Sequence, residues 1–142
     1  MTIDQIISVL KKTKLLGTMS DNFLSTLAFS AEDIPFSTGD VLLKSKDTDV
    51  KAIIILDGRA FVQKQTNPIE LKTGSIIGLL SLINNETMKD PIIAGSSGQC
   101  LILNKELFDK LIREFGEFSE QLKKQIQSKL THQIEELSNT VI

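Results

Sequence analysis

The sequence predicts a mainly β protein with flanking helices: an eight-stranded double-sheet β-roll, or jelly roll, between N-terminal helices and a long C-terminal helix. Apolar residues recur at helical spacing in residues 1–33, in short β-type runs separated by turn residues in 34–104, and at helical spacing again in 105–142. Eight short strands at nearly even intervals are typical of a closed or double-sheet β-structure. We therefore expect a single domain that contains these three parts.

Length and composition agree with one globular unit. The chain has 142 residues, of which 41% are hydrophobic and 24% are charged, and no apolar run approaches the roughly 20 residues of a membrane-spanning helix. It lacks the basic start and apolar centre of a signal peptide, and its single cysteine cannot form an internal disulfide. We expect a cytoplasmic protein without a membrane partner, and the net charge of −2 argues against a nucleic-acid partner.

Two helices are predicted before the β-roll. Thr2 and Gln5 form a capping-box pattern ahead of apolar residues at helical spacing. Gly17 interrupts the pattern, and either Ser20 or Asp21 can cap a second helix. The N-terminal part should therefore be a pair of amphipathic helices.

The predicted strands are short and are separated by specific turn residues. They are expected at residues 34–36, 41–43, 52–56, 60–63, 69–71, 75–77, 92–94 and 100–103. Gly39 offers a positive φ, Asp57-Gly58 is a two-residue hairpin signal, and Asn67-Pro68 starts another turn. These signals predict a meander of hairpins.

Two helices are predicted after the β-roll. Asn104 can cap the first, which should end near Gly116. The second is long, and its apolar residues lie mostly four apart, so that they drift around the helix instead of forming one straight stripe. They are Phe118, Leu122, Ile126, Leu130, Ile134, Leu137 and Val141.

A drifting stripe cannot face one flat surface along its whole length. We expect the start of the long helix to pack on its own domain and the rest to face a second subunit, so that the protein is a homodimer. The proposed dimer contacts are Leu122, Ile126, Leu130, Ile134 and Leu137.

The stretch 73–98 has the pattern of an anion cradle. Gly78 is followed by about one helical turn at 79–83, so the backbone N–H groups of Leu79 and Leu80, with the Ser81 hydroxyl, would point into one small volume. Lys89 follows on the far side of a polar loop. An ordinary strand–turn–strand connection explains the same residues, and both interpretations stay open at this point.

Three segments carry a resemblance to a known family. They are Phe-Ser-Thr-Gly-Asp-Val-Leu at 36–42, Ala-Ile-Ile-Ile-Leu-Asp-Gly-Arg-Ala-Phe-Val at 52–62, and Thr-Gly-Ser-Ile-Ile-Gly-Leu-Leu-Ser-Leu-Ile at 73–83. In this order and spacing the chain resembles the cyclic-nucleotide-binding domain family. The resemblance implies a β-roll with a phosphate-binding cassette that begins at Gly78.

The cassette departs from the family pattern at three positions. Leu79 stands where ligand-binding members have a glutamate that accepts a hydrogen bond from the ribose 2′-hydroxyl, and Lys89 stands where they have an arginine. Asp90 replaces a small or hydroxyl residue and would repel a phosphate. We therefore expect cAMP or cGMP to bind weakly or not at all, although another small anion stays possible. If the cassette faces a solvent-accessible cavity, none of the three side chains should be buried in the core.

Two smaller points follow from the same resemblance. A family glycine is replaced by Lys46, which affects loop shape. The long helix would bring Thr131, His132 and Gln133 over the nucleotide base, whereas a solvated helix face, the favoured interpretation, explains the same polar residues.

The remaining residues do not point to catalysis. No nucleophile triad, P-loop or dinucleotide motif is present, and Cys100 and His132 lack the spacing of a zinc site and give little basis for haem ligation. We expect no enzyme activity and no certain cofactor. The favoured function is a regulatory module that senses a small anionic ligand. The alternative is a structural or interaction module that dimerises or docks a protein partner through its terminal helix.

Overall fold

A computed structural model describes residues 1–46, 48–64, 67–132 and 140–141. The N-terminal helices are α1 (Ile3–Lys11) and α2 (Asp21–Ser30). The predicted capping box is present, because the Thr2 hydroxyl accepts a hydrogen bond from the Gln5 N–H at 3.2 Å and the Gln5 side chain accepts one from the Thr2 N–H at 2.8 Å. Ser20 caps α2 by accepting a hydrogen bond from the Phe23 N–H.

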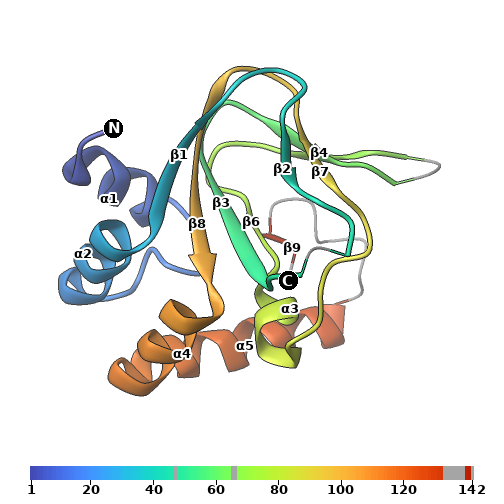
Figure 1. The fold of residues 1–142 in the computed structure, drawn as a ribbon. Coiled ribbons are helices and arrows are strands. Elements are labelled where there is room, and N and C mark those ends of the chain that lie inside the picture. Colours follow the sequence, from blue (N-terminus) through green and yellow to red (C-terminus); the bar gives the residue numbers. More distant parts are fainter. Residues whose placement is uncertain (47, 65–66, 133–139, 142) are drawn as a thin grey trace.

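All eight predicted strands are present, and the predicted fold class is confirmed (Figure 1). The strands are β1 (Glu32–Phe36), β2 (Val41–Leu43), β3 (Lys51–Asp57), β4 (Ala60–Val62), β5 (Ile69–Leu71), β6 (Ile76–Ile77), β7 (Ile92–Ala94) and β8 (Gly98–Asn104), with a further short strand, β9 (Thr140–Val141). The other helices are α3 (Leu79–Asn84), α4 (Lys105–Glu114) and α5 (Gly116–His132). No helix among the described residues is long and apolar enough to cross a membrane.

The strands form two sheets. The hairpin expected at Asn67-Pro68 is present, because β4 and β5 pair antiparallel, but the continuous meander of hairpins is wrong. One sheet has the order β1-β8-β3-β6-β9 and the other the order β2-β7-β4-β5. The Asp57-Gly58 turn therefore carries the chain from one sheet to the other. Gly58 has φ +83°, and a Cβ there would lie 2.5 Å from the Ser97 carbonyl oxygen. The local sequence predicts the reversal correctly, but the packing of the two sheets decides which strands pair.

Strand β3 is buried on both faces and separates two apolar cores. Ile54 and Leu56 belong to a helix-side core between the five-stranded sheet and the helices. Ile53 and Ile55 belong to an inter-sheet core between the two sheets. Because successive side chains of a strand point to opposite faces, one continuous apolar run fills both cores.

The start of α5 is anchored in the helix-side core through phenylalanine rings. Phe118 is 1% exposed, and its ring centroid lies 4.8 Å from that of Phe23 and 5.9 Å from that of Phe108. Leu122 is buried in the same core, so our assignment of Leu122 to the dimer contact is wrong.

The structure describes only some of the other apolar residues predicted along the long helix. Ile126 is half-buried, and Leu130 lies in the last part of α5. Ile134 and Leu137 lie outside the described residues. Val141, expected on the long helix, lies in β9 instead, which pairs with β6 in parallel. The dimer itself stays a prediction.

Lys46, which stands where the family resemblance expects a glycine, has a left-handed backbone conformation. Lys46 has φ +54°, and its N–H donates to the Met88 carbonyl at 3.0 Å. A side chain in this conformation costs about 1–2 kcal/mol, which glycine avoids, while its greater freedom in the unfolded chain offsets part of the gain.

We expect Lys46→Gly to raise the free energy of unfolding by about 0.5–1 kcal/mol, measured by denaturant titration. Lys44→Gly is the matched control, because Lys44 is also exposed but has no positive φ. It should lower stability by about 0.5–1 kcal/mol. A loss of stability in both variants would contradict the strain assigned to Lys46.

Candidate functional site

The glycine and the short helix of the predicted cradle are present. Gly78 directly follows β6 and precedes α3, as the sequence predicts, and its φ is +105°. A Cβ at this position would lie 2.5 Å from the Lys51 carbonyl oxygen and 2.9 Å from the Ala52 Cα, so only glycine lets α3 begin this close to β3. Figure 1 shows α3 at the end of the β-roll where α4 and α5 also lie.

Helix α3 is held in place by α4 and by the helix-side core. Lys105 on α4 donates a hydrogen bond from Nζ to the Leu82 carbonyl at 2.7 Å and pairs with Asp109 at 3.1 Å. Leu82 is fully buried. At the far end Asn85 adopts φ +55°, and the Glu86 N–H donates to the Ser81 carbonyl. These contacts fix both ends of α3.

Leu79 does not line a solvent-accessible cavity, which corrects our expectation. It is 2% exposed and belongs to the helix-side core. In a six-residue helix that must bury one face, Leu79 and Leu82 lie three residues apart and share that face. The side chain that replaces the family glutamate thus packs as a core residue.

The other cradle residues are nearer to solvent. Leu80 is 38% exposed, Lys89 is exposed, and Ser81 and Asp90 are half-buried. Within the described residues, no hydrogen bond or ion pair joins the Lys89 or Asp90 side chain to the first turn of α3. The structure therefore keeps the cationic residue in the loop after α3 without fixing it on the cradle.

The loop that carries Lys89 is held through its backbone. The Lys89 carbonyl accepts a hydrogen bond from the Ser45 hydroxyl, and the Pro91 carbonyl accepts one from the Gln63 N–H at 2.9 Å. Met88 packs against the inter-sheet core. These contacts position the loop and leave the Lys89 side chain exposed.

The predicted base-side residues are only partly described. Thr131 and His132 lie in the last turn of α5, and Gln133 lies outside the described residues. Nothing therefore tests a contact between these side chains and a base.

Cys100 is part of the inter-sheet core. Burial, with smaller effects from the carboxylates of Asp33 and Glu32, raises its pKa to about 11. The thiol is protonated at neutral pH and so is a poor metal ligand or nucleophile. Among the residues that the structure describes, no group of three or more His, Cys, Asp or Glu side chains could hold a metal ion.

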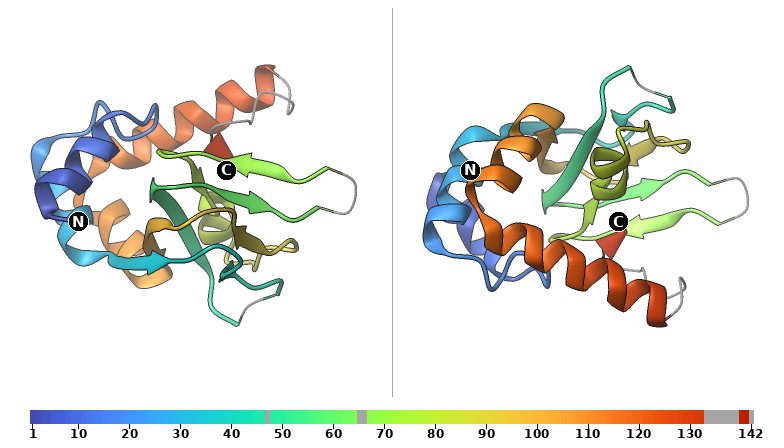
Figure 2. Two further views of the ribbon diagram at one scale, coloured as in Figure 1. Left: turned by 90° about the horizontal axis from the view of Figure 1, so that it is seen from above. Right: turned by 90° about the horizontal axis from the view of Figure 1, so that it is seen from below.

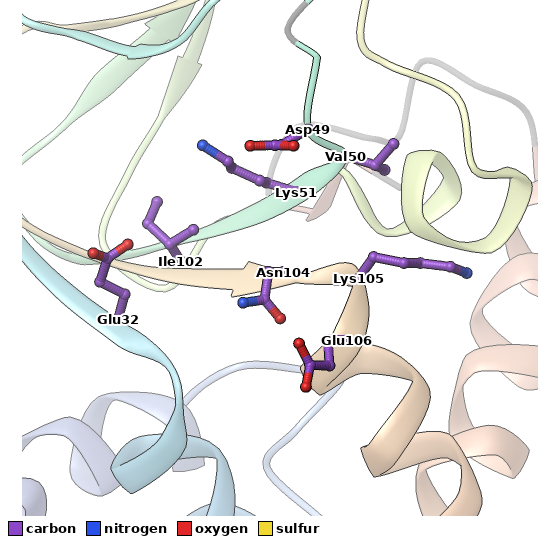
Figure 3. Close-up of a pocket in the computed structure, with 8 residues that line it drawn as sticks. All are labelled: Glu32, Asp49, Val50, Lys51, Ile102, Asn104, Lys105 and Glu106. Carbon is purple, nitrogen blue, oxygen red and sulfur yellow. The ribbon is translucent and has the colours of Figure 1, made fainter.

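Sequence reasoning missed a cavity of about 450 Å³ beside the ends of β3 and β8 (Figure 3). Its lining residues are Glu32, Asp49, Val50, Lys51, Ile102, Asn104, Lys105 and Glu106. The Asn104 side chain accepts a hydrogen bond from the Leu107 N–H at 2.8 Å and so caps α4. Lys105 extends away from Asn104 and Glu106 toward its partners Leu82 and Asp109 (Figure 3).

The charges around this cavity have both signs, and two of its polar side chains already serve α4. It therefore does not define a ligand of one charge. Its residues come from strand ends and a helix cap far apart in the sequence, so no local pattern could have predicted it.

A second cavity, of about 260 Å³, has a different character. It lies between the segment after α1 and the turn before β6, and its charged residues are all lysines: Lys12, Lys14 and Lys72. A third cavity, of about 330 Å³, is lined by Lys110 and Arg113 together with Glu106. None of these three cavities is lined by a residue of the predicted cradle.

Comparisons with known proteins agree with the fold. No family model matches the chain. It is 27% identical over 108 residues to a cAMP-dependent protein kinase regulatory subunit from Mucor circinelloides f. lusitanicus, a match that covers 72% of this chain and 25% of that protein.

Solved structures show a similar fold. The regulatory domain of Toxoplasma gondii PKA, crystallised with cAMP, superposes with a TM-score of 0.70 at 22% identity over 89% of this chain and 50% of that one. The regulatory subunit of a cAMP-independent protein kinase A from Trypanosoma brucei superposes with a TM-score of 0.73 at 20% identity over 92% and 47%. The chain thus spans about half or less of these proteins. Its resemblance to the cyclic-nucleotide-binding domain family, expected from the sequence, is confirmed.

Replacing Gly78 tests the close approach of the cassette to β3. Gly78→Ala should lower the free energy of unfolding by about 2–4 kcal/mol, because it adds a steric clash to the positive-φ strain. Gly39→Ala is the matched control, since Gly39 has φ +91° but no atom within 4 Å of an added Cβ, and it should cost only about 1–2 kcal/mol. Equal losses in denaturant titrations would mean that the approach to β3 adds nothing.

Replacing Leu79 tests its burial. Leu79→Glu should lower the free energy of unfolding by about 3 kcal/mol or more, because it places an unpaired carboxylate in the helix-side core. Leu80→Glu, at the neighbouring and partly exposed position, should cost less than about 1 kcal/mol. A nearly neutral Leu79→Glu would show that this side chain can face a cavity after all.

Proposed function

We propose that this chain is a non-catalytic regulatory module of the cyclic-nucleotide-binding type in which tight binding of cAMP and cGMP has been lost. The observation that carries the proposal is the burial of Leu79 in a cassette that otherwise keeps its backbone shape. The cradle backbone stays suited to an anion, while the side-chain contacts that would hold a cyclic nucleotide are missing.

The size of the expected loss follows from the missing contacts. Leu79 offers no acceptor to a ribose hydroxyl, and Lys89 offers a point charge where a planar guanidinium would hold two phosphate oxygens. Each charge-assisted hydrogen bond contributes about 1.5–3 kcal/mol, so two missing contacts lower affinity by roughly two to four orders of magnitude. The Asp90 carboxylate adds repulsion.

The comparisons support a regulatory module, and one of them supports a regulatory role without control by cAMP. One similar structure is the regulatory subunit of a cAMP-independent kinase, and a triple mutant of that subunit, with one substitution from threonine to arginine, was solved with cAMP bound in its A site. In the present chain Lys89 stands at the position where the family resemblance expects arginine.

The alternative is an interaction module that keeps the roll for its shape. The exposure of large apolar side chains favours it: Phe29 at the end of α2 is 80% exposed, and Leu80 and Ile83 on α3 are 38% and 40% exposed. Such side chains commonly anchor protein partners. In this case neither cyclic nucleotides nor small anions would bind the cassette, and the protein partner or second copy would contact these side chains or the terminal helix.

Calorimetry with cAMP and cGMP separates the possibilities. The unmodified protein should bind neither ligand more tightly than a Kd of roughly 100 μM. Lys89→Arg with Asp90→Ser should raise affinity by about tenfold or more, because it restores a bidentate phosphate partner and removes a repulsive charge. Lys89→Arg alone should change little, since Asp90 still opposes the phosphate.

Lys44→Arg is the control for a general effect of arginine on the same surface, and it should not change binding. Sub-micromolar binding of either nucleotide by the unmodified protein would contradict the proposal. A folded double variant that still binds nothing would favour the interaction module.

A further inference from the structure

Three lysines surround the 260 Å³ cavity described above. Lys12 and Lys14 come from the segment after α1, and Lys72 comes from the turn before β6; all three are exposed. Figure 2 shows these two segments side by side in both views. A Cβ added to Gly74 would lie 3.8 Å from the Thr13 Cγ2, which confirms that they are close. The cavity therefore joins parts of the chain about 60 residues apart.

Both segments are fixed by hydrogen bonds. The Thr13 side chain is buried, and its hydroxyl donates to the Leu10 carbonyl at 2.8 Å and accepts from the Leu16 N–H at 3.0 Å. In the other segment the Ser75 hydroxyl accepts from the Lys72 N–H at 3.0 Å, and the Ser75 N–H donates back to the Lys72 carbonyl at 2.9 Å. The three lysines therefore extend from two backbone segments that hydrogen bonds hold in place.

The charge of this cavity is of one sign. Its other lining residues are Thr13, Thr73, Gly74 and Ser75, and none is acidic. Within the described part of the chain no carboxylate lies within 4.0 Å of these three ammonium groups, whereas Lys11 pairs with Asp21 at 3.6 Å and Lys105 with Asp109 at 3.1 Å. Three like charges around a small volume repel one another, and a bound anion relieves that repulsion.

We propose that this lysine cavity binds a compact, multiply charged oxyanion, namely a diphosphate group. Its volume equals that of roughly nine liquid waters and lies below the 300–1,000 Å³ of sites for drug-sized molecules. It therefore suits a phosphate-type group better than a whole nucleotide. Ammonium groups bind phosphate oxygens through charge-assisted hydrogen bonds. The site precedes β6, whereas the cassette follows it, so the proposal is independent of cyclic-nucleotide binding.

Calorimetric titration with inorganic diphosphate tests the proposal. Saturable binding is expected, and changing Lys12, Lys14 and Lys72 together to Gln should weaken it at least 100-fold, with each single change costing about 5–10-fold. The control changes Lys110, Lys123 and Lys124 to Gln, which alters the net charge equally at exposed positions elsewhere, and it should weaken binding less than about threefold. Thermal unfolding should show that both triple variants fold, because all six side chains are exposed.

A second set of titrations uses ATP or orthophosphate in place of diphosphate. Binding of ATP with the same dependence on the three lysines would identify a nucleotide as a source of the diphosphate group, and binding of diphosphate alone would identify the free anion. Orthophosphate should bind at least tenfold more weakly than diphosphate, since fewer oxygens meet the three ammonium groups. Absence of saturable diphosphate binding, or equal weakening in the control triple variant, would overturn the proposal.

Discussion

The burial of β3 on both faces is the constraint on which the rest of the structure depends. A single run of apolar side chains supplies both the helix-side core and the inter-sheet core, because alternate residues point to opposite sides of the strand. Strands β8 and β6 pair with it on its two edges. Strand β3 therefore contacts α1 and α3 as well as its two neighbours in the sheet.

This constraint also explains how α3 keeps its place. Gly78 places α3 against the start of β3, and the burial of Leu79 and Leu82 holds the helix there. A glutamate at position 79 would direct a carboxylate toward the place that Leu79 fills with apolar atoms. The Leu79 side chain therefore contributes to stability, and the proposed loss of cyclic-nucleotide binding rests on that burial.

The cassette and the lysine cavity differ in their charged side chains. The cassette has one exposed lysine beside an aspartate, which is a weak anion site by local charge. The lysine cavity before β6 has three ammonium groups and no acidic lining residue. Anion recognition in this chain is therefore better supported by side chains outside the cassette than by those within it, and the two places can be tested separately.

The sequence by itself determined the local elements of this protein. The strands, the caps Thr2, Ser20 and Asn104, and the positive φ of Gly39 depend on short-range patterns, since periodicity, side-chain capping and positive φ each involve only a few neighbouring residues. Only the tertiary structure decided which strands pair, whether Leu79 faces a core or a cavity, and which lysines share a volume. The Asp57-Gly58 turn has the local pattern of a hairpin, yet its two strands belong to different sheets. Lys72 lies near Lys12 and Lys14 only in the folded chain. Such outcomes depend on contacts between residues far apart in the chain, which no local pattern contains.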